Sequence, residues 1–456
     1  MSLHTGTEVH RHGADSPGLA DIRHTSRSGL ASVLAALREH RQCLWQAYAR
    51  ELPPELPARY LPEINPPRWE LGHIAWFEEF WIARYPQRHL GRQASPDAPR
   101  AAPKLPRADA LYNSSHVPHT RRWHLDLPSA ERTWALADQV RTHTLALLPH
   151  LADDDTGLYF ARLVAAHEAM HLEAWFYMAQ TLAIDLRSTG LALQPARSRS
   201  PVQELSIPAQ VFTCGHEGSG FAFDNELPAV ACTLEAFDID SAPVTWGRFL
   251  PFIEAGGYDD ARWWSTEGWA WRQKHSTGRP RHVVQERGHW QRAVCGQWVA
   301  LDPDEPAVHL SAHEAQAWCR WAGRRLPTEA EWECAALTQG EGFEWGQVWE
   351  WTSSPFAPYP GFEPHPYRDY SAPWFDGRPV LRGASFATWP GLRSPRYRNY
   401  FPAERNDVFA GFRSCAATPA RADTPDQATA AAEPAVTPAP RKRRTSAGRP
   451  SSAEPS

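Results

Sequence analysis

Three histidines have the spacing needed to bind one metal ion together. His167 and His171 are four residues apart in a segment with helical periodicity, so both imidazoles should lie on one face of a helix. His73 lies in a second helical segment, among apolar and aromatic residues. A histidine on one bundle helix that faces a pair on another is a common way to build a metal site. Three neutral imidazoles with open positions suit Fe(II), Ni(II) or Zn(II), and ligand type alone leaves that choice open.

Two carboxylates lie beside the histidine pair but are poorly placed to be ligands. Glu168 follows His167 by one position, about 100° around a helix, and Glu173 follows His171 by two positions, about 200°. We therefore expect both to support the ligands from behind rather than to bind the metal.

The elements that must position these residues are four predicted helices. Helical periodicity predicts them over residues 29–52, over about 69–85, after Ser129 and over about 156–184. Ser129 should cap the third helix, without the glutamate that completes a capping box. Four long helices with one long connection predict a four-helix bundle over residues 28–190.

From residue 200 to residue 416 the pattern changes to short segments rich in Trp, Gly and Pro. Brief strand-like runs at 211–213 and 380–382 alternate with helical segments at 311–319 and 328–333. Thr328 should cap the second of these helices. The chain is therefore expected to be a multidomain α+β protein, with an irregular α+β domain after the bundle.

The ends of the chain and its composition exclude several classes of protein. Residues 1–27 are expected to form a disordered leader and residues 417–456 a disordered tail. The net charge of -5 argues against nucleic-acid binding, and no apolar run approaches the ~20 residues of a membrane span. Seven scattered cysteines without a CxxC pair indicate the free thiols of a reducing cytoplasm.

Several motifs, taken together and in order, resemble a known family. "LGHIAWFEEFW" and "HEAMHLEAW" resemble the DinB-like domain of the sulfoxide synthases of ergothioneine biosynthesis. The second region resembles the formylglycine-generating-enzyme-like domain of the same family, whose fold is C-type-lectin-like. Its motifs are "DNELP", "PVTWGRF", "RRLPTEAEWE", "VWEWTSS", "VLRGASFAT" and "RNYFPAERNDVFAGFR". The resemblance covers residues 28–416 and keeps the order of both domains.

The resemblance implies a function and assigns roles to residues. The family holds non-haem Fe(II) with three histidines, which match His73, His167 and His171. It uses O2 to join sulfur to C2 of the imidazole of hercynine, the trimethylated betaine of histidine. The matching positions imply that Tyr367 donates a proton near the iron. The positions implied to contact hercynine are Tyr370, Asn399 and Met170, the last replacing a family glutamine.

The positions expected to bind the second substrate depart from the family pattern. Members that use γ-glutamylcysteine carry an aspartate where this chain has Phe401, although Arg405 is retained. They carry arginines where this chain has His116 and His119. Unpaired buried charges are costly, so these positions favour a neutral substrate over a charged dipeptide. The sequence is here more similar to the selenoneine synthase branch, which joins hercynine to the selenosugar 1-seleno-N-acetylglucosamine.

The sequence leaves two alternatives open and argues against two others. The first alternative is a hercynine sulfoxide synthase that uses cysteine or γ-glutamylcysteine. The second is a DinB-type Zn-dependent thiol transferase, which would not need Tyr367 or Asn399. A formylglycine-generating enzyme itself is excluded, because no cysteine lies between Gly383 and Ser414. A purely structural metal normally has four protein ligands, and three are evident.

Overall fold

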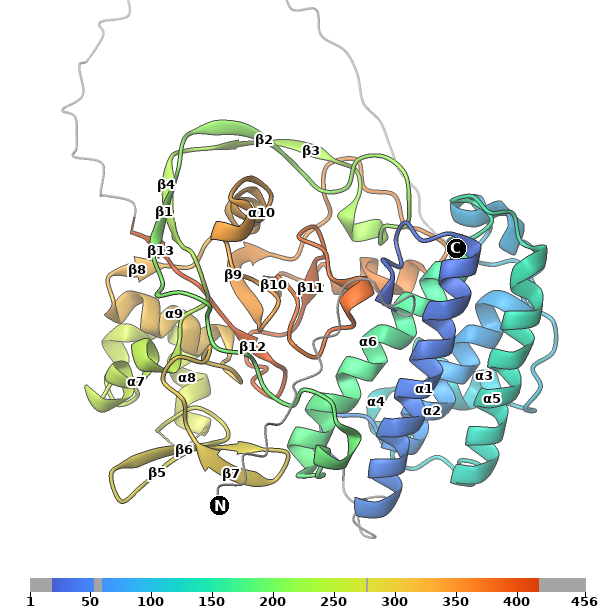
Figure 1. The fold of residues 1–456 in the computed structure, drawn as a ribbon, viewed down its shortest axis with the longest axis horizontal. Coiled ribbons are helices and arrows are strands. Elements are labelled where there is room, and N and C mark those ends of the chain that lie inside the picture. Colours follow the sequence, from blue (N-terminus) through green and yellow to red (C-terminus); the bar gives the residue numbers. More distant parts are fainter. Residues whose placement is uncertain (1–18, 53–59, 276–277, 418–456) are drawn as a thin grey trace, which may run out of the picture. The chain divides into compact units, whose positions relative to one another are not determined.

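Four long helices pack side by side in the N-terminal region (Figure 1). They are α1 (Arg27–Glu51), α2 (Pro67–Glu78), α5 (Ala130–Leu147) and α6 (Tyr159–Leu182). The computed structural model describes residues 19–52, 60–275 and 278–417. Helix α2 packs against α5 and α6, and α1 packs against the same two helices. The short helices α3 (Ala108–Tyr112) and α4 (His119–Arg122) lie in the connection between α2 and α5.

The ends of these helices follow local sequence signals. Ser129 caps α5 by accepting a hydrogen bond from the N–H of Arg132, as predicted. Helix α2 begins at Pro67, because proline is favoured at the first helical position. The helix predicted over 69–85 changes after Glu78 into a π-helical turn, η3 (Glu79–Ala83).

A buried group of four charged side chains joins the four helices. Arg141 on α5 donates to both carboxylate oxygens of Glu78 on α2, at 2.9 and 2.8 Å. It also donates to Glu168 on α6, whose other oxygen accepts from Arg41 on α1 at 2.7 Å. All four side chains are at most 1% exposed. Removing any one of them would leave an uncompensated buried charge, so the group fixes how the helices pack.

The C-terminal region consists of short strands joined by long irregular loops. One sheet has the order β1 (Glu204–Ile207), β4 (Phe237–Asp240), β13 (Cys415–Ala416) and β8 (Arg324–Arg325). A second has the order β11 (Asn399–Tyr400), β10 (Pro379–Arg382), β9 (Trp349–Pro355) and β12 (Ala410–Gly411). Strand β12 runs parallel to β9, whereas β10 is antiparallel to both of its neighbours.

Two smaller sheets and four α-helices, besides short 3-10 turns, make up the rest of the regular structure described in this region. The sheets are the hairpin of β2 (Gln210–Cys214) and β3 (Val230–Leu234) and the meander of β5 (Val283–Glu286), β6 (His289–Val294) and β7 (Gln297–Ala300). The helices are α7 (Trp246–Glu254), α8 (Thr266–Lys274), α9 (Ala312–Trp321) and α10 (Glu329–Thr338). Thr328 caps α10 as predicted, in a complete capping box with Glu331. The strand-like runs at 211–213 and 380–382 lie within β2 and β10, which confirms both.

The expected leader, residues 1–27, is too long. Ile22 is fully buried, and its N–H donates to the carbonyl of Gly391 at 2.8 Å. Arg23 forms a two-bond ion pair with buried Glu226, with nitrogen–oxygen distances of 2.6 and 2.7 Å. These contacts hold the segment before α1 against the C-terminal region. Residues 1–18 and the predicted tail from residue 418 onward lie outside the described residues.

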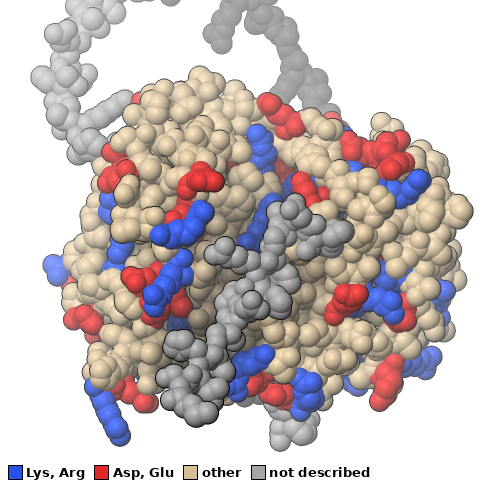
Figure 2. Space-filling view, in the orientation of Figure 1, with Lys and Arg blue, Asp and Glu red and all other residues tan. Residues whose placement is uncertain are grey.

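The seven cysteines are free, as their scattered spacing predicted. None of the helices in the described part of the chain is long and apolar enough to cross a membrane. On the face drawn in Figure 2, Lys and Arg side chains are interspersed with Asp and Glu.

Candidate active site

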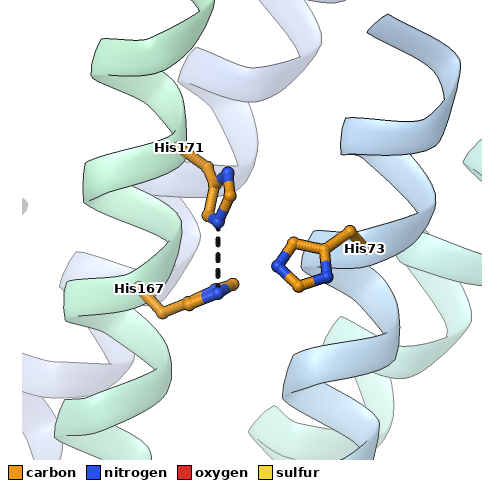
Figure 3. Close-up of side chains that lie close together, drawn as sticks. All are labelled: His73, His167 and His171. Atoms are coloured by element: carbon orange, nitrogen blue, oxygen red, sulfur yellow. Dashed lines mark hydrogen bonds between the residues drawn. The ribbon is translucent and has the colours of Figure 1, made fainter. Parts of the chain in front are cut away.

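His73, His167 and His171 converge in the structure, as their spacing predicted (Figure 3). One ring nitrogen from each lies within 4.8 Å of the other two, and the Nε2 atoms of His167 and His171 are 3.2 Å apart. His73 comes from α2, and the other two come from successive turns of α6. The group therefore spans two packed helices and can present three nitrogens to one ion.

Neighbouring groups fix how the imidazoles point. Nδ1 of His73 lies 2.8 Å from the carbonyl oxygen of Tyr112. A carbonyl only accepts, so Nδ1 carries the proton and Nε2 keeps its lone pair for a metal. Trp69 stacks on His73 with ring centres 4.7 Å apart, and Phe77 stacks on His167 at 3.5 Å. Each of these two rings is thus held on one face.

The chain beside His73 is shaped to bring this carbonyl close. A Cβ on Gly72 would lie 2.2 Å from the ring of Tyr112, so a larger residue there would push Tyr112 away. Trp69 donates its Nε1 hydrogen to the carbonyl of Leu111 at 2.8 Å, which anchors the same turn of α3. The "LGH" sequence therefore serves the metal centre through packing as well as through the histidine.

Sequence reasoning missed Glu70, the carboxylate that faces the histidines. It lies one turn before His73 on α2, and its Oε2 is 2.7 Å from Nδ1 of His171. The two atoms are close but poorly aligned for a hydrogen bond, so the contact is electrostatic. Asn65 donates to the other oxygen at 2.8 Å. Burial alone would raise the pKa of Glu70, but the opposing effect of His171 and its other neighbours lowers the pKa to about 2.

Burial keeps two of the imidazoles neutral. His73 is 2% exposed, and burial together with the neighbouring His171 lowers its pKa to about 3. Burial also holds the pKa of His167 well below its ordinary value. Neutral imidazoles are the form that binds metals. The three residues therefore fit a first-row divalent metal with open coordination positions.

A cavity of about 270 Å³ opens beside His167 and His171. Five residues predicted to act at the site line it: Met170, Tyr367, Tyr370, Asn399 and Phe401. They come from α6, from the loop around the turn η10 (Arg368–Tyr370), and from β11 and the residue that follows it. Further aromatic walls are Tyr177, Trp349, Tyr397 and Tyr400. The cavity is thus built by both regions of the chain.

The two loop tyrosines approach the histidines from the C-terminal region. The ring centre of Tyr367 is 6.4 Å from that of His167 and 4.9 Å from that of Phe77. The hydroxyl of Tyr370 lies 3.5 Å from Sδ of Met170. Burial raises the pKa of Tyr367 above its ordinary value, so its hydroxyl keeps its proton at neutral pH.

The expected place of Glu168 and Glu173 behind the histidines is wrong. Glu168 belongs to the buried arginine group that joins the helices. Glu173 accepts hydrogen bonds from Nε1 of Trp349 at 2.7 Å and from the hydroxyls of Ser385 and Thr388 at 2.5 and 2.7 Å. All three donors lie in the C-terminal region, so Glu173 fastens the histidine-bearing helix to it. The helical rotation that excludes both carboxylates as ligands also turns them toward other elements.

Three residues predicted to bind the second substrate lie outside this cavity. Arg405 is paired with Asp407 through contacts of 2.5 and 2.7 Å. Nε2 of His119 lies 2.9 Å from a backbone carbonyl oxygen. His116 lines a separate hollow of about 200 Å³, which also borders Tyr367. Of these three residues, His116 therefore lies near Tyr367, and Arg405 lies with its guanidinium 4.9 Å from the ring centre of Phe401; both aromatic residues line the main cavity.

The fold and the site define a class of two-part proteins, in which a helical region with a three-histidine centre precedes an irregular α+β domain. Residues 191–347 match the family described as the sulfatase-modifying factor enzyme 1-like domain. The chain is 32% identical to the hercynine oxygenase of Mycolicibacterium smegmatis, over 85% of this chain and 98% of that protein. It is 33% identical to the hercynine oxygenase of Mycobacterium tuberculosis, over 79% of this chain and 92% of that protein. The chain belongs to the hercynine oxygenase family, which confirms the family predicted from the motifs.

The C-terminal region has relatives of a second kind. The formylglycine-generating enzyme of Streptomyces coelicolor is 34% identical over 36% of this chain and 58% of that protein. This match agrees with a formylglycine-generating-enzyme-like domain after the helices.

Proposed function

We propose that this protein is a non-haem Fe(II) enzyme that uses O2 to join the selenium of 1-seleno-N-acetylglucosamine to C2 of the imidazole of hercynine. Its helical region would be a DinB-like bundle that holds the iron. The observation that carries the proposal is the cavity in which His167 and His171 face Tyr367, Tyr370 and Asn399. Membership of the hercynine oxygenase family supports hercynine and O2 as substrates.

His73, His167 and His171 would hold the iron through one ring nitrogen each. Iron bound there would supply the redox chemistry by which O2 is reduced while the C2–H bond of the imidazole and the Se–H bond of the selenol are replaced by the carbon–selenium bond. The chain contributes a preorganised setting, because Trp69 and Phe77 each cover one face of an imidazole ring.

The aromatic walls suit a quaternary ammonium. The trimethylammonium of hercynine has no hydrogen to donate, so an aromatic face is its natural partner. Tyr370, Tyr397 and Trp349 line the cavity and offer such faces. Asn399 stands on the same wall, where its side-chain amide can donate to the hercynine carboxylate. Met170, whose sulfur lies 3.5 Å from the Tyr370 hydroxyl, would contact hercynine from α6.

Tyr367 is proposed to donate a proton during the oxygen chemistry. Its raised pKa keeps it a neutral phenol, the form that can donate. It stands between the main cavity and the hollow that His116 lines, so it borders both proposed substrate positions.

The second substrate is proposed to be a neutral sugar. The hollow beside Tyr367 combines aromatic faces and neutral polar groups with three charged residues, Asp97, Arg368 and Asp369. Arg368 is already paired with Asp97, and Asp369 accepts from the Ser115 hydroxyl, so the hollow is proposed to offer hydrogen bonds to a hexose rather than free charges to a dipeptide. Its lining includes Trp76, Phe80, Trp81, Asn113, Ser114 and His116. Arg405 lies with its guanidinium 4.9 Å from the ring centre of Phe401, but it is already paired with Asp407. A carboxylate would have to compete for it, and Phe401 cannot neutralise an ammonium.

A second candidate is a hercynine sulfoxide synthase that uses cysteine or γ-glutamylcysteine. One observation favours it: a cavity of about 640 Å³ is lined by Arg272, Arg281 and Arg405, which could receive carboxylates in exchange for their present partners Asp259, Glu63 and Asp407. A Zn-dependent thiol transferase would not need O2, whereas both of the other candidates would, so the O2 requirement distinguishes it from them.

The test is a set of parallel incubations. The Fe(II)-loaded protein receives hercynine and air with the selenosugar, its thiosugar analogue, cysteine or γ-glutamylcysteine, and adducts are identified by mass. The proposal expects the selenosugar adduct, formed only with O2. Adducts with γ-glutamylcysteine or cysteine instead would support the sulfoxide synthase. Transfer without O2 and with Zn(II) would support the thiol transferase.

A further inference from the structure

Tyr367 and Tyr370 lie on one short irregular segment, residues 365–371. Within this segment, the described regular structure is one 3-10 turn of three residues, η10 (Arg368–Tyr370). A loop positions functional side chains accurately when other contacts hold it in place. The contacts at the two ends of this segment therefore decide where both tyrosines lie.

One carboxylate, Asp224, bonds both ends of the segment. Oδ1 accepts a hydrogen bond from the hydroxyl of Ser371, and Oδ2 accepts from the N–H of His365 at 3.4 Å. Asn225 donates to the Ser371 hydroxyl at 3.0 Å. Asp224, Asn225 and Ser371 are at most 2% exposed. The "DNELP" motif, which marks the domain family, thus faces the tyrosine segment.

Other bonds each support a single point of the segment. The hydroxyl of Tyr159 lies 3.0 Å from Nδ1 of His365, and the hydroxyl of Tyr400 donates to the carbonyl of Tyr370. Arg368 donates to Asp97 at 2.9 Å, and Asp369 accepts from the Ser115 hydroxyl at 2.7 Å. Asp224 differs from these because its two oxygens reach the two ends at once.

Burial of a carboxylate at this position lowers the stability of the fold. The hydrogen bonds that Asp224 accepts come from neutral donors, and burial raises its pKa to about 6. The neighbouring carboxylate of Glu226 adds repulsion. An asparagine would be easier to bury, but its side chain has one acceptor oxygen where Asp224 has two. The geometry of the segment, rather than stability, therefore accounts for an aspartate.

We propose that Asp224 is a positioning residue that holds Tyr367 and Tyr370 against the cavity. The inference rests on the proposed function, which gives the two tyrosines their roles. Asp224 lines neither the main cavity nor the hollow of His116, and it acts through the ends of the segment.

Hydrogen exchange tests the anchoring without any turnover. In Asp224→Ala, amides of residues 365–371 should exchange at least about tenfold faster, while those of α6 stay unchanged, because local opening is set by local contacts. Asp238→Asn is the matched control, since Asp238 accepts from the Ser206 hydroxyl at 2.6 Å on exposed strands. It should change neither region. Unchanged exchange of residues 365–371 in Asp224→Ala overturns the proposal, and faster exchange throughout the chain shows a merely structural role.

A double-mutant cycle tests whether the anchoring serves the tyrosines. Asp224→Ala should lower kcat at least about tenfold in the wild type but under about twofold in a Tyr367→Phe background. The same cycle against Tyr370→Phe, read as the dissociation constant of hercynine by calorimetry under nitrogen, needs no turnover. Equal losses in both backgrounds contradict the proposal. If the wild type neither binds nor converts hercynine, the proposed function fails, while the exchange experiment still decides whether Asp224 holds the segment.

Discussion

The metal centre and the substrate wall differ in how the chain holds them. The three histidines stand on two regular helices, whose packing is fixed by a buried group of two arginines and two glutamates. Tyr367 and Tyr370 come from a short irregular segment held by a few polar contacts, and Asn399 comes from the short strand β11 at the edge of a sheet. Helices fix the geometry that a metal requires, whereas loops can change to fit other substrates. Changes on the helices should therefore affect metal binding, and changes on the loops should affect chemistry and substrate choice.

The largest effect is expected when a histidine ligand is removed. His73→Ala, His167→Ala and His171→Ala should each lose iron and all measurable turnover but stay folded, because each leaves two imidazoles for the metal and removes little core volume. Metal analysis and circular dichroism check this. His150→Ala, at the exposed end of η5 (Leu148–His150), should keep both properties. Stoichiometric iron in all three ligand variants would contradict the assignment.

For the tyrosine segment we expect a variant to lose turnover while it keeps its bound iron. Tyr367→Phe removes one hydroxyl, so turnover should fall about 10²–10⁴-fold, the usual contribution of a positioned proton donor. Hercynine affinity should change by less than about 1 kcal/mol, the scale of one neutral hydrogen bond. Steady-state kinetics and calorimetry measure both. Tyr359→Phe is the control, because that buried hydroxyl has no hydrogen-bond partner within the described residues. Unchanged turnover in Tyr367→Phe rejects the role.

What the sequence could predict depends on how local the signal is. The helical spacing of His167 and His171, and the caps at Ser129 and Thr328, depend on neighbours within one turn, so all four were placed correctly. Met170, Tyr370 and Asn399 were found through motifs of a known family, and the structure brings them to one cavity.

The rest depends on contacts between distant parts of the chain. Glu70 precedes His73 by three positions, which places both on one face of α2, but its contact with His171 arises only because α2 packs on α6. Glu173 could be excluded as a ligand by its rotation, but its partners lie about 200 residues away. The defined structure of residues 19–26 likewise depends on a distant residue, because Arg23 forms an ion pair with Glu226.

A smaller effect is expected at Glu70, on the helix side. Glu70→Gln removes the charge beside His171, so iron affinity should fall about 10–100-fold, as for other groups that orient a ligand. Competition with a chelator measures the affinity. Turnover at saturating iron should change less, because the three ligands remain. Glu131→Gln, exposed in the first turn of α5, is the control. Normal iron affinity in Glu70→Gln would show that Glu70 has no part in the centre.

The smallest effect on catalysis is expected where the two regions meet. Glu173→Gln keeps one acceptor oxygen but turns an N–H toward a buried donor, so the free energy of unfolding should fall by about 1–3 kcal/mol. Iron should stay bound, because the histidines are unchanged, and turnover should fall only a few-fold. Denaturant unfolding and metal analysis check this. Loss of iron with normal stability would place Glu173 in the metal centre instead.

The most direct measurement is a competition between two second substrates. Wild-type protein, loaded with Fe(II) and saturated with hercynine in air, receives equal concentrations of 1-seleno-N-acetylglucosamine and γ-glutamylcysteine, and both adducts are counted by mass. The hollow proposed for the second substrate borders Tyr367, which shares the main cavity with Phe401. A dipeptide brings an ammonium and carboxylates, but Phe401 offers no charge and Arg405 is already paired, so the account predicts mainly the selenosugar adduct. Phe401→Asp should shift the ratio toward γ-glutamylcysteine. A wild-type ratio of one or less would contradict the account and establish the sulfoxide synthase.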